Sequence, residues 1–266
     1  EIYAWLAAPQ NSVRARSVGL LGLAQSNSGE AAAAVLAALS DSDTSIQRSA
    51  AVAARSISAA EATQQFAAQL DKLPPTAQAL LLAALADRGD SAALDAVTAA
   101  AQSPDTSVSL AAVSALGSLG NVSSVPRLAE LAGKAEGDLQ IEARASLASL
   151  RGADIDNAIV AAVEKADPPV RRELVRALGS RHATESVPAL LLAANDPDET
   201  VRAQAYVALG RLAPANRLKP IVESLAVEQS DAARAEGEKA ALAVLARGSD
   251  AALSAVTVLS ALPDVK

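Results

Sequence analysis

From Asp198 to Gly210 the chain reads DETVRAQAYVALG, and from Asp167 to Gly179 it reads DPPVRRELVRALG. Each stretch starts with a loop acid, continues with valine and arginine, and carries apolar residues five and eight positions after the valine. Stretches that start at Ser12 and Thr106 also carry a valine with apolar residues five and eight positions after it. The first apolar residue of each copy is its anchor, and the anchors are Val13, Ile46, Ala77, Val108, Leu139, Val170 and Val201. The spacing is 33 residues once and 31 residues five times, which indicates a tandem repeat.

Another helical segment, the first helix of the repeat, precedes each later anchor, and the helix that contains the anchor is the second helix. These alanine-rich or apolar segments cover residues 31–39, 62–70, 91–101, 124–132, 158–165 and 186–194. Prolines stand near segment starts at Pro126, Pro188 and Pro220, where a missing N–H breaks no helical hydrogen bond. Loops rich in Ser and Asp stop one helix and cap the next. The repeat is therefore predicted to be a helix–turn–helix unit, and no strand pattern competes with it.

The predicted array is a single domain over residues 1–266. Residues 2–8 are expected to form a lone first helix, residues 218–247 an irregular repeat, and residues 250–266 a truncated one. Within the irregular repeat, Ser230 is the expected cap of one longer helix, and Glu238 falls on an anchor-like position. Repeat arrays normally carry polar capping repeats, so we expect this array to belong to a longer protein.

Composition narrows the classes of fold and function. Alanine makes up about a quarter of the chain and aromatic residues only 2%, which favours close packing of helices. The absence of Cys and the single His182 exclude thiolate or multi-histidine metal sites, so no metal is expected. A net charge of −7 argues against nucleic-acid binding. The longest apolar runs are too short to span a membrane, and no signal peptide is recognised. The compartment stays open between the cytoplasm and an exported fragment.

The motif D-x-x-V-R-x-x-A-x-x-A-L-G resembles the short bacterial HEAT repeats of the phycocyanobilin-lyase (PBS lyase) type. This resemblance implies an all-α, right-handed α-solenoid of about eight HEAT-like helix pairs, with the armadillo/HEAT architecture. It also implies that the second helices line the concave surface. Arrays of this family serve as scaffolds, adaptors and, less often, enzymes.

The residue that follows each anchor lies at the edge of the buried arc. In the Val170 repeat it is Arg171, next to loop acids such as Asp167 and Asp198. We predict that these residues form a ladder of salt bridges and hydrogen bonds between repeats. The counterparts of Arg171 are Arg14, Gln47, Gln78, Ser109, Gln140, Arg202 and Arg234.

Positions two and six after the anchor point away from the core, and in the middle repeats they are unusually small or apolar. Tight curvature could favour small residues on this face. Alternatively, the face is a shallow groove for an acidic, amphipathic protein or peptide, with an apolar floor and a basic rim. The groove residues under this hypothesis are Leu110, Ile141, Arg172, Arg176, Val207 and Arg211, with Val52 as a further floor residue. Only Glu173 is near enough in sequence to neutralise the two arginines of its helix.

Enzymatic signatures are absent. Within the resembling family, deoxyhypusine hydroxylases hold iron with His-Glu dyads, whereas here His182 precedes Ala183 and is interpreted as a helix-terminal partner. No nucleotide-binding glycine motif occurs, and no cofactor or catalytic residue is predicted. The sequence therefore favours a non-enzymatic protein-interaction scaffold or recognition module. The alternatives are a lyase-like chromophore-handling protein, for which Tyr206 near Arg172 and Arg176 is the main support, or a structural spacer in a multidomain bacterial protein. The oligomeric state stays open.

Overall fold

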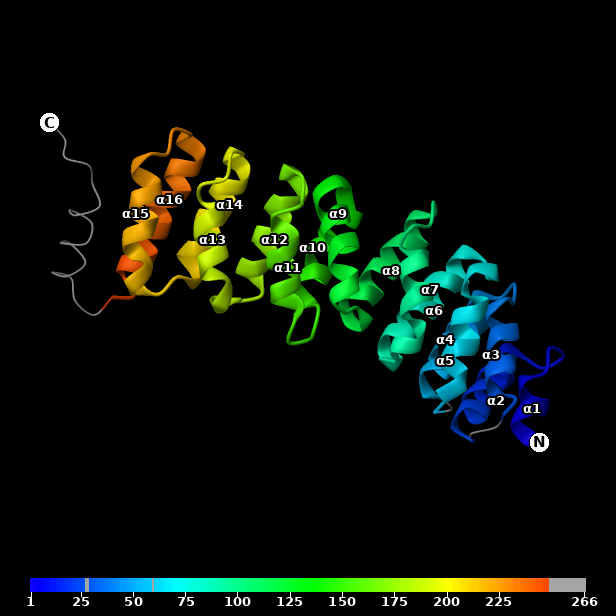
Figure 1. Ribbon diagram of the computed structural model, residues 1–266. Helices are drawn as coiled ribbons and strands as arrows, with labels where there is room; N and C mark the ends of the chain where they lie inside the picture. The colour runs from blue at the N-terminus through cyan, green and yellow to red at the C-terminus, as the bar shows by residue number, and fades with distance from the viewer. Residues whose placement is uncertain (27–28, 59, 249–266) are drawn as a thin grey trace, which may run out of the picture. The chain divides into compact units, whose positions relative to one another are not determined.

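A computed structural model describes residues 1–26, 29–58 and 60–248. Every regular element in these residues is helical (Figure 1). The chain forms two compact units, the first covering residues 1–124 and the second starting at Val125. The helices of the first unit are α1 (Ile2–Ala7), α2 (Val13–Gln25), α3 (Ala31–Leu39), α4 (Thr44–Ser56), α5 (Ala60–Gln69), α6 (Pro75–Arg88), α7 (Leu94–Ala100) and α8 (Thr106–Leu119). Those of the second are α9 (Val125–Lys134), α10 (Gly137–Ser149), α11 (Ile155–Val163), α12 (Pro168–Ser180), α13 (Val187–Ala193), α14 (Glu199–Leu212), α15 (Leu218–Ala226) and α16 (Asp231–Leu245).

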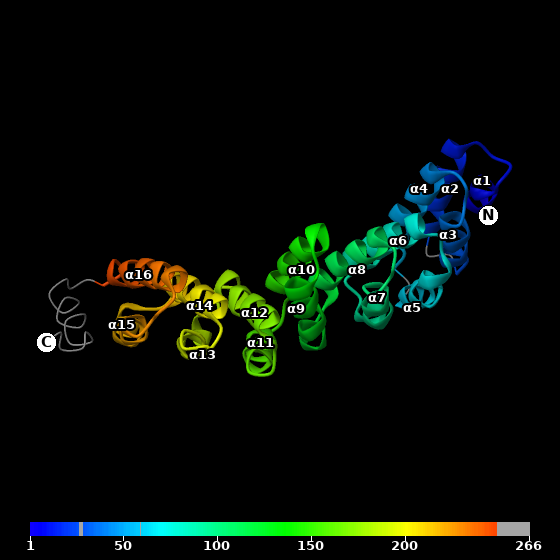
Figure 2. The same cartoon turned by 90° about the horizontal axis from the view of Figure 1, so that it is seen from above.

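Each unit consists of two layers of helices. In the second unit, α10, α12, α14 and α16 lie side by side in one layer, and α9, α11, α13 and α15 in the other (Figure 2). In the first unit, α2, α4, α6 and α8 form the corresponding second-helix layer, and α3, α5 and α7 the first-helix layer. The fold is an all-α solenoid of helix pairs, as the repeat pattern predicts.

Loop acids start many of the second helices. The side chain of Asp198 accepts hydrogen bonds from the backbone N–H groups of Thr200 and Val201 over 2.9 and 3.2 Å. Asp105 caps α8 in the same way. The pKa of both carboxyls lies below the ordinary value because hydrogen bonds from the capped turn favour the charged form. Ser230 caps α16, which is a single helix of 15 residues, so the predicted longer helix is confirmed.

The second helices share one buried pattern. Residues four, seven and eight positions after the anchor are buried in the repeats anchored at Ile46, Ala77, Val108, Leu139, Val170 and Val201, for example Ala205, Ala208 and Leu209 after Val201. The residue at position five is also buried in five of these repeats and is an aliphatic side chain, or a tyrosine in α14. These residues are Ala51, Leu82, Val113, Val175 and Tyr206. In α10 this core position holds Arg144.

The first anchor requires a correction. Val13 is 40% exposed, whereas the residues four, five, seven and eight positions after Ala15 are all buried. Ala15 precedes Ile46 by 31 residues, so the first repeat has the same length as the others. The sequence SVRAR contains two candidate anchors, and the valine was the wrong choice. Glu238 is exposed, so it does not occupy a core position of α16.

The ladder at the start of the second helices is confirmed, with changes in its membership. Each contributing residue reaches a carbonyl of its own loop, the acid of the next loop, or both. Arg171 pairs with Asp196 over 3.0 Å. In the first repeat the member is Arg16, which pairs with Asp41 over 2.5 Å; Arg14 makes no ion pair with any described residue. Further members are Gln47, Gln78, Ser109, Arg202 and Arg234. Gln140 makes no such contact within the residues described.

A second ladder runs along the other end of these helices. Nη1 of Arg181 donates to the carbonyls of Ala148 and Leu150, over 3.0 and 2.6 Å, at the end of the preceding second helix. Arg88 and Arg247 bind the ends of α4 and α14 in the same manner. Helix ends leave carbonyls without intrahelical partners, and these arginines satisfy them across the repeat boundary. The truncated repeat expected at 250–266 lies outside the described residues.

Candidate functional site

The second-helix layer of the second unit carries five of the six residues predicted to contact a partner. Ile141 lies on α10, Arg172 and Arg176 on α12, and Val207 and Arg211 on α14. Residues four apart on a helix share a face, so each pair points in one direction. Leu110 lies on α8 in the first unit, where it is half-buried.

A buried carboxylate gathers three arginines on this layer. Glu173 of α12 is only 1% exposed. Arg144 of α10 donates to it from Nε and Nη2 over 2.8 and 2.9 Å. Arg172 donates from Nη2 and Nε over 3.0 and 3.2 Å. Nε of Arg176 lies 3.0 Å from Oε2, an ion pair at an angle that forms no hydrogen bond.

This group, called here the arginine cluster, consists of Arg144, Arg172, Arg176 and Glu173. Its formal charge is three positive and one negative, so it is net positive by two. No other carboxylate of the described chain forms an ion pair with these arginines. The guanidinium-bearing side chains are 30%, 30% and 42% exposed, so the excess charge faces solvent.

The cluster replaces apolar packing between two repeats. Arg144 occupies the position that is apolar or aromatic in the other second helices, and α10 packs against α12 less extensively than α12 packs against α14. A buried ion pair is a poor substitute for well-packed apolar side chains in terms of stability. From the sequence, Glu173 is predicted only to neutralise the two arginines of its own helix. In the structure Glu173 holds the arginines in place, so Arg172 and Arg176 are part of an internal contact as well as of the surface.

The apolar residues of this layer differ in exposure. Ile141 is 62% exposed, one helical turn from Arg144. Val207 is half-buried and lines a groove of about 330 Å³ between α14 and α16, whose edges also include Glu199 and Glu236. The groove edge beside Val207 is therefore acidic, and the predicted rim residues Arg172, Arg176 and Arg211 do not line it. Arg211 is exposed and has no ion pair with a described residue.

Sequence reasoning missed Arg144, Glu199 and Glu236. The signal for Arg144 was available, because an arginine at a repeat position that is otherwise apolar marks a polar contact within the core. The burial of Glu173 had no comparable signal, since its position three after the anchor varies in character among repeats.

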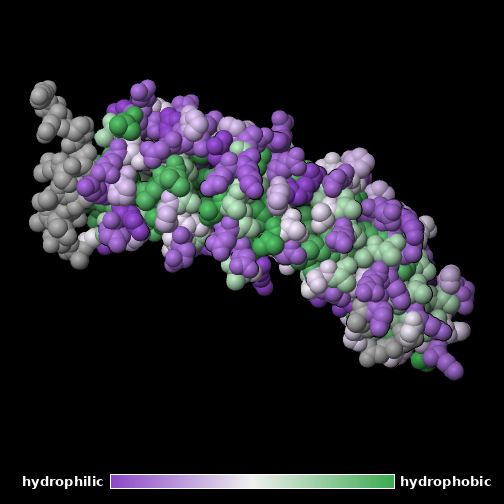
Figure 3. All heavy atoms as spheres, viewed as in Figure 1, coloured by the Kyte–Doolittle hydropathy of each residue, from purple (hydrophilic) through white to green (hydrophobic). Residues whose placement is uncertain are grey.

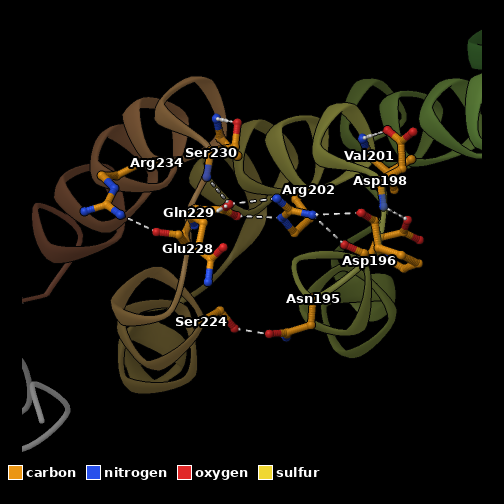
Figure 4. A network of polar contacts seen from close by, with 12 residues as sticks. Asn195, Asp196, Asp198, Val201, Arg202, Ser224, Glu228, Gln229, Ser230 and Arg234 are labelled. Atoms are coloured by element: carbon orange, nitrogen blue, oxygen red, sulfur yellow. Dashed lines mark hydrogen bonds and ion pairs between the residues drawn. The ribbon is translucent and has the colours of Figure 1, made fainter.

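Another polar network lies at the next repeat boundary (Figure 4). Arg202 donates from Nε and Nη2 to Glu228 over 2.7 and 2.8 Å, and from Nη1 to the carbonyl of Asp196 over 2.9 Å. The backbone N–H groups of Gln229 and Ser230 each donate to Glu228 over 2.9 Å. The hydrogen bonds between Arg202 and Glu228 lower the pKa of the Glu228 carboxyl and raise the pKa of the Arg202 guanidinium. The hydrogen-bond donors and acceptors of this network satisfy one another, which is typical of a structural contact.

Tyr206 lies beside this network and is fully buried. Burial, with the nearby Glu228 charge, raises the pKa of its phenol to about 12. Its hydroxyl has no hydrogen-bond partner among the described residues. Tyr206 is therefore a core residue, whereas the lyase-like interpretation needs it on an accessible surface with Arg172 and Arg176.

The opposite, first-helix layer of the second unit faces the viewer in Figure 3, where hydrophobic side chains gather around α13. Leu192 of α13 is 75% exposed. A groove of about 670 Å³ lies between α9, α11 and the start of α12. Its lining includes Lys134 and Asp167, which are paired over 3.0 Å.

Membrane-spanning helices and clusters of metal ligands are both absent from the described residues. No helix there is long and apolar enough to cross a membrane. No group of three or more His, Cys, Asp or Glu side chains in those same residues is arranged to hold a metal ion. His182 lies two residues after the end of α12, is exposed, and has a positive φ of 57°.

The sequence matches the family of HEAT repeats over residues 64–148 and 155–243, and the chain belongs to this family. No protein with a curated description matches it. Among solved structures, that of Kap95p with RanGDP has a TM-score of 0.57 at 15% identity, covering 96% of this chain and 40% of the other.

Two further structures have lower TM-scores. Human deoxyhypusine hydroxylase in complex with glycerol has a TM-score of 0.41 at 19% identity, covering 91% of this chain and 94% of the other. The complex of CpcE and CpcF of phycocyanin lyase from Nostoc sp. PCC7120 has a TM-score of 0.43 at 18% identity, covering 91% and 93%. At such identities the similarity concerns the fold.

Proposed function

We propose that this HEAT-repeat chain is a non-enzymatic scaffold that binds an acidic segment of a protein partner on the second-helix layer of its second unit. The observation that carries the proposal is the arginine cluster, which is net positive by two on a chain of net charge −7. A local charge opposite in sign to that of the whole molecule favours selective capture of an acidic ligand.

Neighbouring side chains supply the apolar contacts that a docking surface also needs. Ile141 offers an exposed apolar contact beside Arg144, and the Val207 groove offers a second one two helices away. The acidic edge at Glu199 and Glu236 favours a ligand that is basic at the end lying over α14 and α16. The proposed partner segment is therefore amphipathic and acidic over α10 and α12. A protein partner is consistent with the similar structure of Kap95p, which binds RanGDP.

The polar residue at position 144 also supports a functional role. If repeat stacking were the only requirement, an aliphatic residue at position 144 would fill the boundary as it does in other repeats. Three arginines for one carboxylate exceed what neutralisation of Glu173 needs. The competing function is that of a structural spacer, which gives no reason for the excess charge.

A fluorescence-anisotropy titration tests the proposal. The probe is a fluorescein-labelled helical peptide of repeated Glu-Leu-Ala-Ala blocks, and a peptide with Gln in place of Glu is the comparison. We expect the acidic peptide to bind the wild-type chain at least about tenfold more tightly than the Gln peptide at low salt. The double variant Arg172→Gln/Arg176→Gln should remove most of that difference.

Arg48→Gln is the matched control. Arg48 follows its anchor Ile46 by two positions, as Arg172 follows Val170, but it is exposed and has no ion pair with a described residue. Equal binding of the acidic and Gln peptides to the wild-type chain contradicts the proposal, as does equal loss in the Arg48 and Arg172/Arg176 variants.

A further inference from the structure

The arginine cluster has unused hydrogen-bond donors. Nη1 of Arg144 and Nη1 of Arg172 donate to no acceptor in the part of the chain that the structure describes, and Arg176 forms no hydrogen bond there. Glu173 already accepts from two arginines and pairs with the third. The free donors therefore remain available to a ligand on the solvent side.

The buried carboxylate of Glu173 fixes the positions of these guanidinium groups. Each has a nitrogen within 3.2 Å of an oxygen of the same buried carboxylate, so the three cations lie close together. Two come from successive turns of α12 and one from α10. Like charges repel at this separation, and one carboxylate offsets only a third of the positive charge. A second anion bound at the exposed side would relieve the repulsion without moving the arginines.

We propose that the arginine cluster recognises a dianionic phosphate monoester, carried by a phosphorylated side chain of the protein partner. This inference rests on the proposed function and specifies the acidic group that the surface accepts. A phosphomonoester carries a charge of about −1.5 to −2 near neutral pH and three acceptor oxygens. Its charge matches the net charge of the cluster, whereas a single carboxylate leaves one positive charge unmatched.

Arginine suits this ligand chemically. The planar guanidinium forms paired N–H bonds to two oxygens of a phosphate, and arginine clusters are a recurring means of reading phosphorylated peptides. Exposed Ile141, one turn from Arg144, favours an apolar residue beside the phosphorylated one. Phosphorylation of the partner would then act as a switch for docking, since the unmodified hydroxyl brings no charge.

The first experiment uses inorganic phosphate, with acetate at matched ionic strength as the carboxylate probe. The Nε–Hε NMR signals of Arg144, Arg172 and Arg176 should shift and saturate with phosphate at a concentration at least about tenfold below that needed with acetate. The signal of Arg48 should not shift. Equal response to both anions, or no response to phosphate, overturns the phosphate inference.

The second experiment compares one labelled peptide, Gly-Leu-Ala-X-Leu-Ala-Gly, with X as serine, glutamate or phosphoserine. The phosphoserine form should bind the wild-type chain at least about tenfold more tightly than the glutamate form, and Arg172→Gln/Arg176→Gln should reduce that ratio to below about threefold. Arg48→Gln should leave it unchanged.

The outcomes separate the two proposals. If the glutamate and phosphoserine peptides bind equally and both exceed serine, the acidic docking surface stands and the phosphate inference fails. If neither exceeds serine, the phosphate inference fails, and the helical Glu-Leu-Ala-Ala peptide decides the proposed function separately. The wild-type comparison holds even if a variant fails to fold, which circular dichroism would reveal.

Discussion

Arg144 of α10 binds Glu173 of α12 through two parallel hydrogen bonds of 2.8 and 2.9 Å, joining adjacent repeats by an ion pair at a position where other repeats use apolar side chains. This contact fixes the arginine cluster and is the basis of the functional proposal. It also determines how the second unit should respond to mutation.

Breaking this contact from one side should destabilise the second unit. In Glu173→Gln, three guanidinium groups lose their shared carboxylate, and we expect a loss of about 2–3 kcal/mol, because the arginines are partly exposed. Urea denaturation followed by circular dichroism measures the change. The exposed Glu199→Gln is the control and should stay within about 0.5 kcal/mol of wild type.

Removing both sides together should cost much less. The double variant Arg144→Leu/Glu173→Leu restores apolar side chains at the boundary, and we expect its stability to lie near or above that of wild type. A double-mutant cycle measures the coupling between the two positions. Additive losses of the two single variants would show that the ion pair is not the unit of interaction.

Acid should weaken the contact between Arg202 and Glu228. The folded pKa of Glu228 lies below its ordinary value, so the pair contributes stability above the unfolded pKa of about 4.3, and this is lost as pH falls through the folded pKa. Glu228→Gln should cost about 2–3 kcal/mol at neutral pH. The difference in melting temperature from wild type should shrink on acidification below about pH 4. A constant difference across that range would contradict this assignment.

The second ladder should matter as much as the first. Arg181→Ala leaves the carbonyls of Ala148 and Leu150 without their partner, and we expect a loss of about 2 kcal/mol. Arg217→Ala, at an exposed arginine of the same unit, is the comparison and should change stability by less than about 0.5 kcal/mol. Equal effects would indicate that Arg181 acts only as a surface charge.

The packing of α1 against α2 should depend on the absence of a side chain at Gly22. A Cβ at Gly22 would lie 2.2 Å from the ring of Tyr3, so Gly22→Ala should displace α1 from α2. Trp5 of α1 is the only tryptophan of the chain, and its fluorescence reports the change. Gly29→Ala, where no atom of a described residue other than its chain neighbours lies within 4 Å of the added Cβ, should leave the spectrum unchanged. An unaltered Trp5 signal in Gly22→Ala would contradict this packing.

Helix order and the first ladder could be predicted from the sequence, because the spacing of 31 residues repeats both the buried positions and the edge position of Arg171 and Arg202. The choice of Arg14 over Arg16 failed because both follow a small apolar residue, and only packing against α1 and Asp41 separates them. The cluster was harder to foresee. Arg144 and Glu173 are 29 residues apart, and periodicity alone gives no direction for a long side chain at a repeat boundary.

The structure also alters one experiment that the sequence suggests. The repeat pattern predicts that Arg172 and Arg176 point away from the core, so from the sequence their replacement by Glu would leave folding intact. Both pair with buried Glu173, so two further carboxylates would crowd it and leave Arg144 as the sole cation of the cluster. The double Glu variant should therefore destabilise the second unit, and replacement by Gln separates binding from folding more cleanly.

Methyl NMR of the wild-type chain, titrated with the acidic Glu-Leu-Ala-Ala peptide, tests the central claim most directly, because it distinguishes the two layers of the second unit. The account predicts that the Ile141 methyl signals on α10 shift on titration, while those of Leu192 on α13 do not. Shifts confined to Leu192 and its neighbours, or an absence of shifts under conditions where the peptide binds, would contradict docking on the second-helix layer.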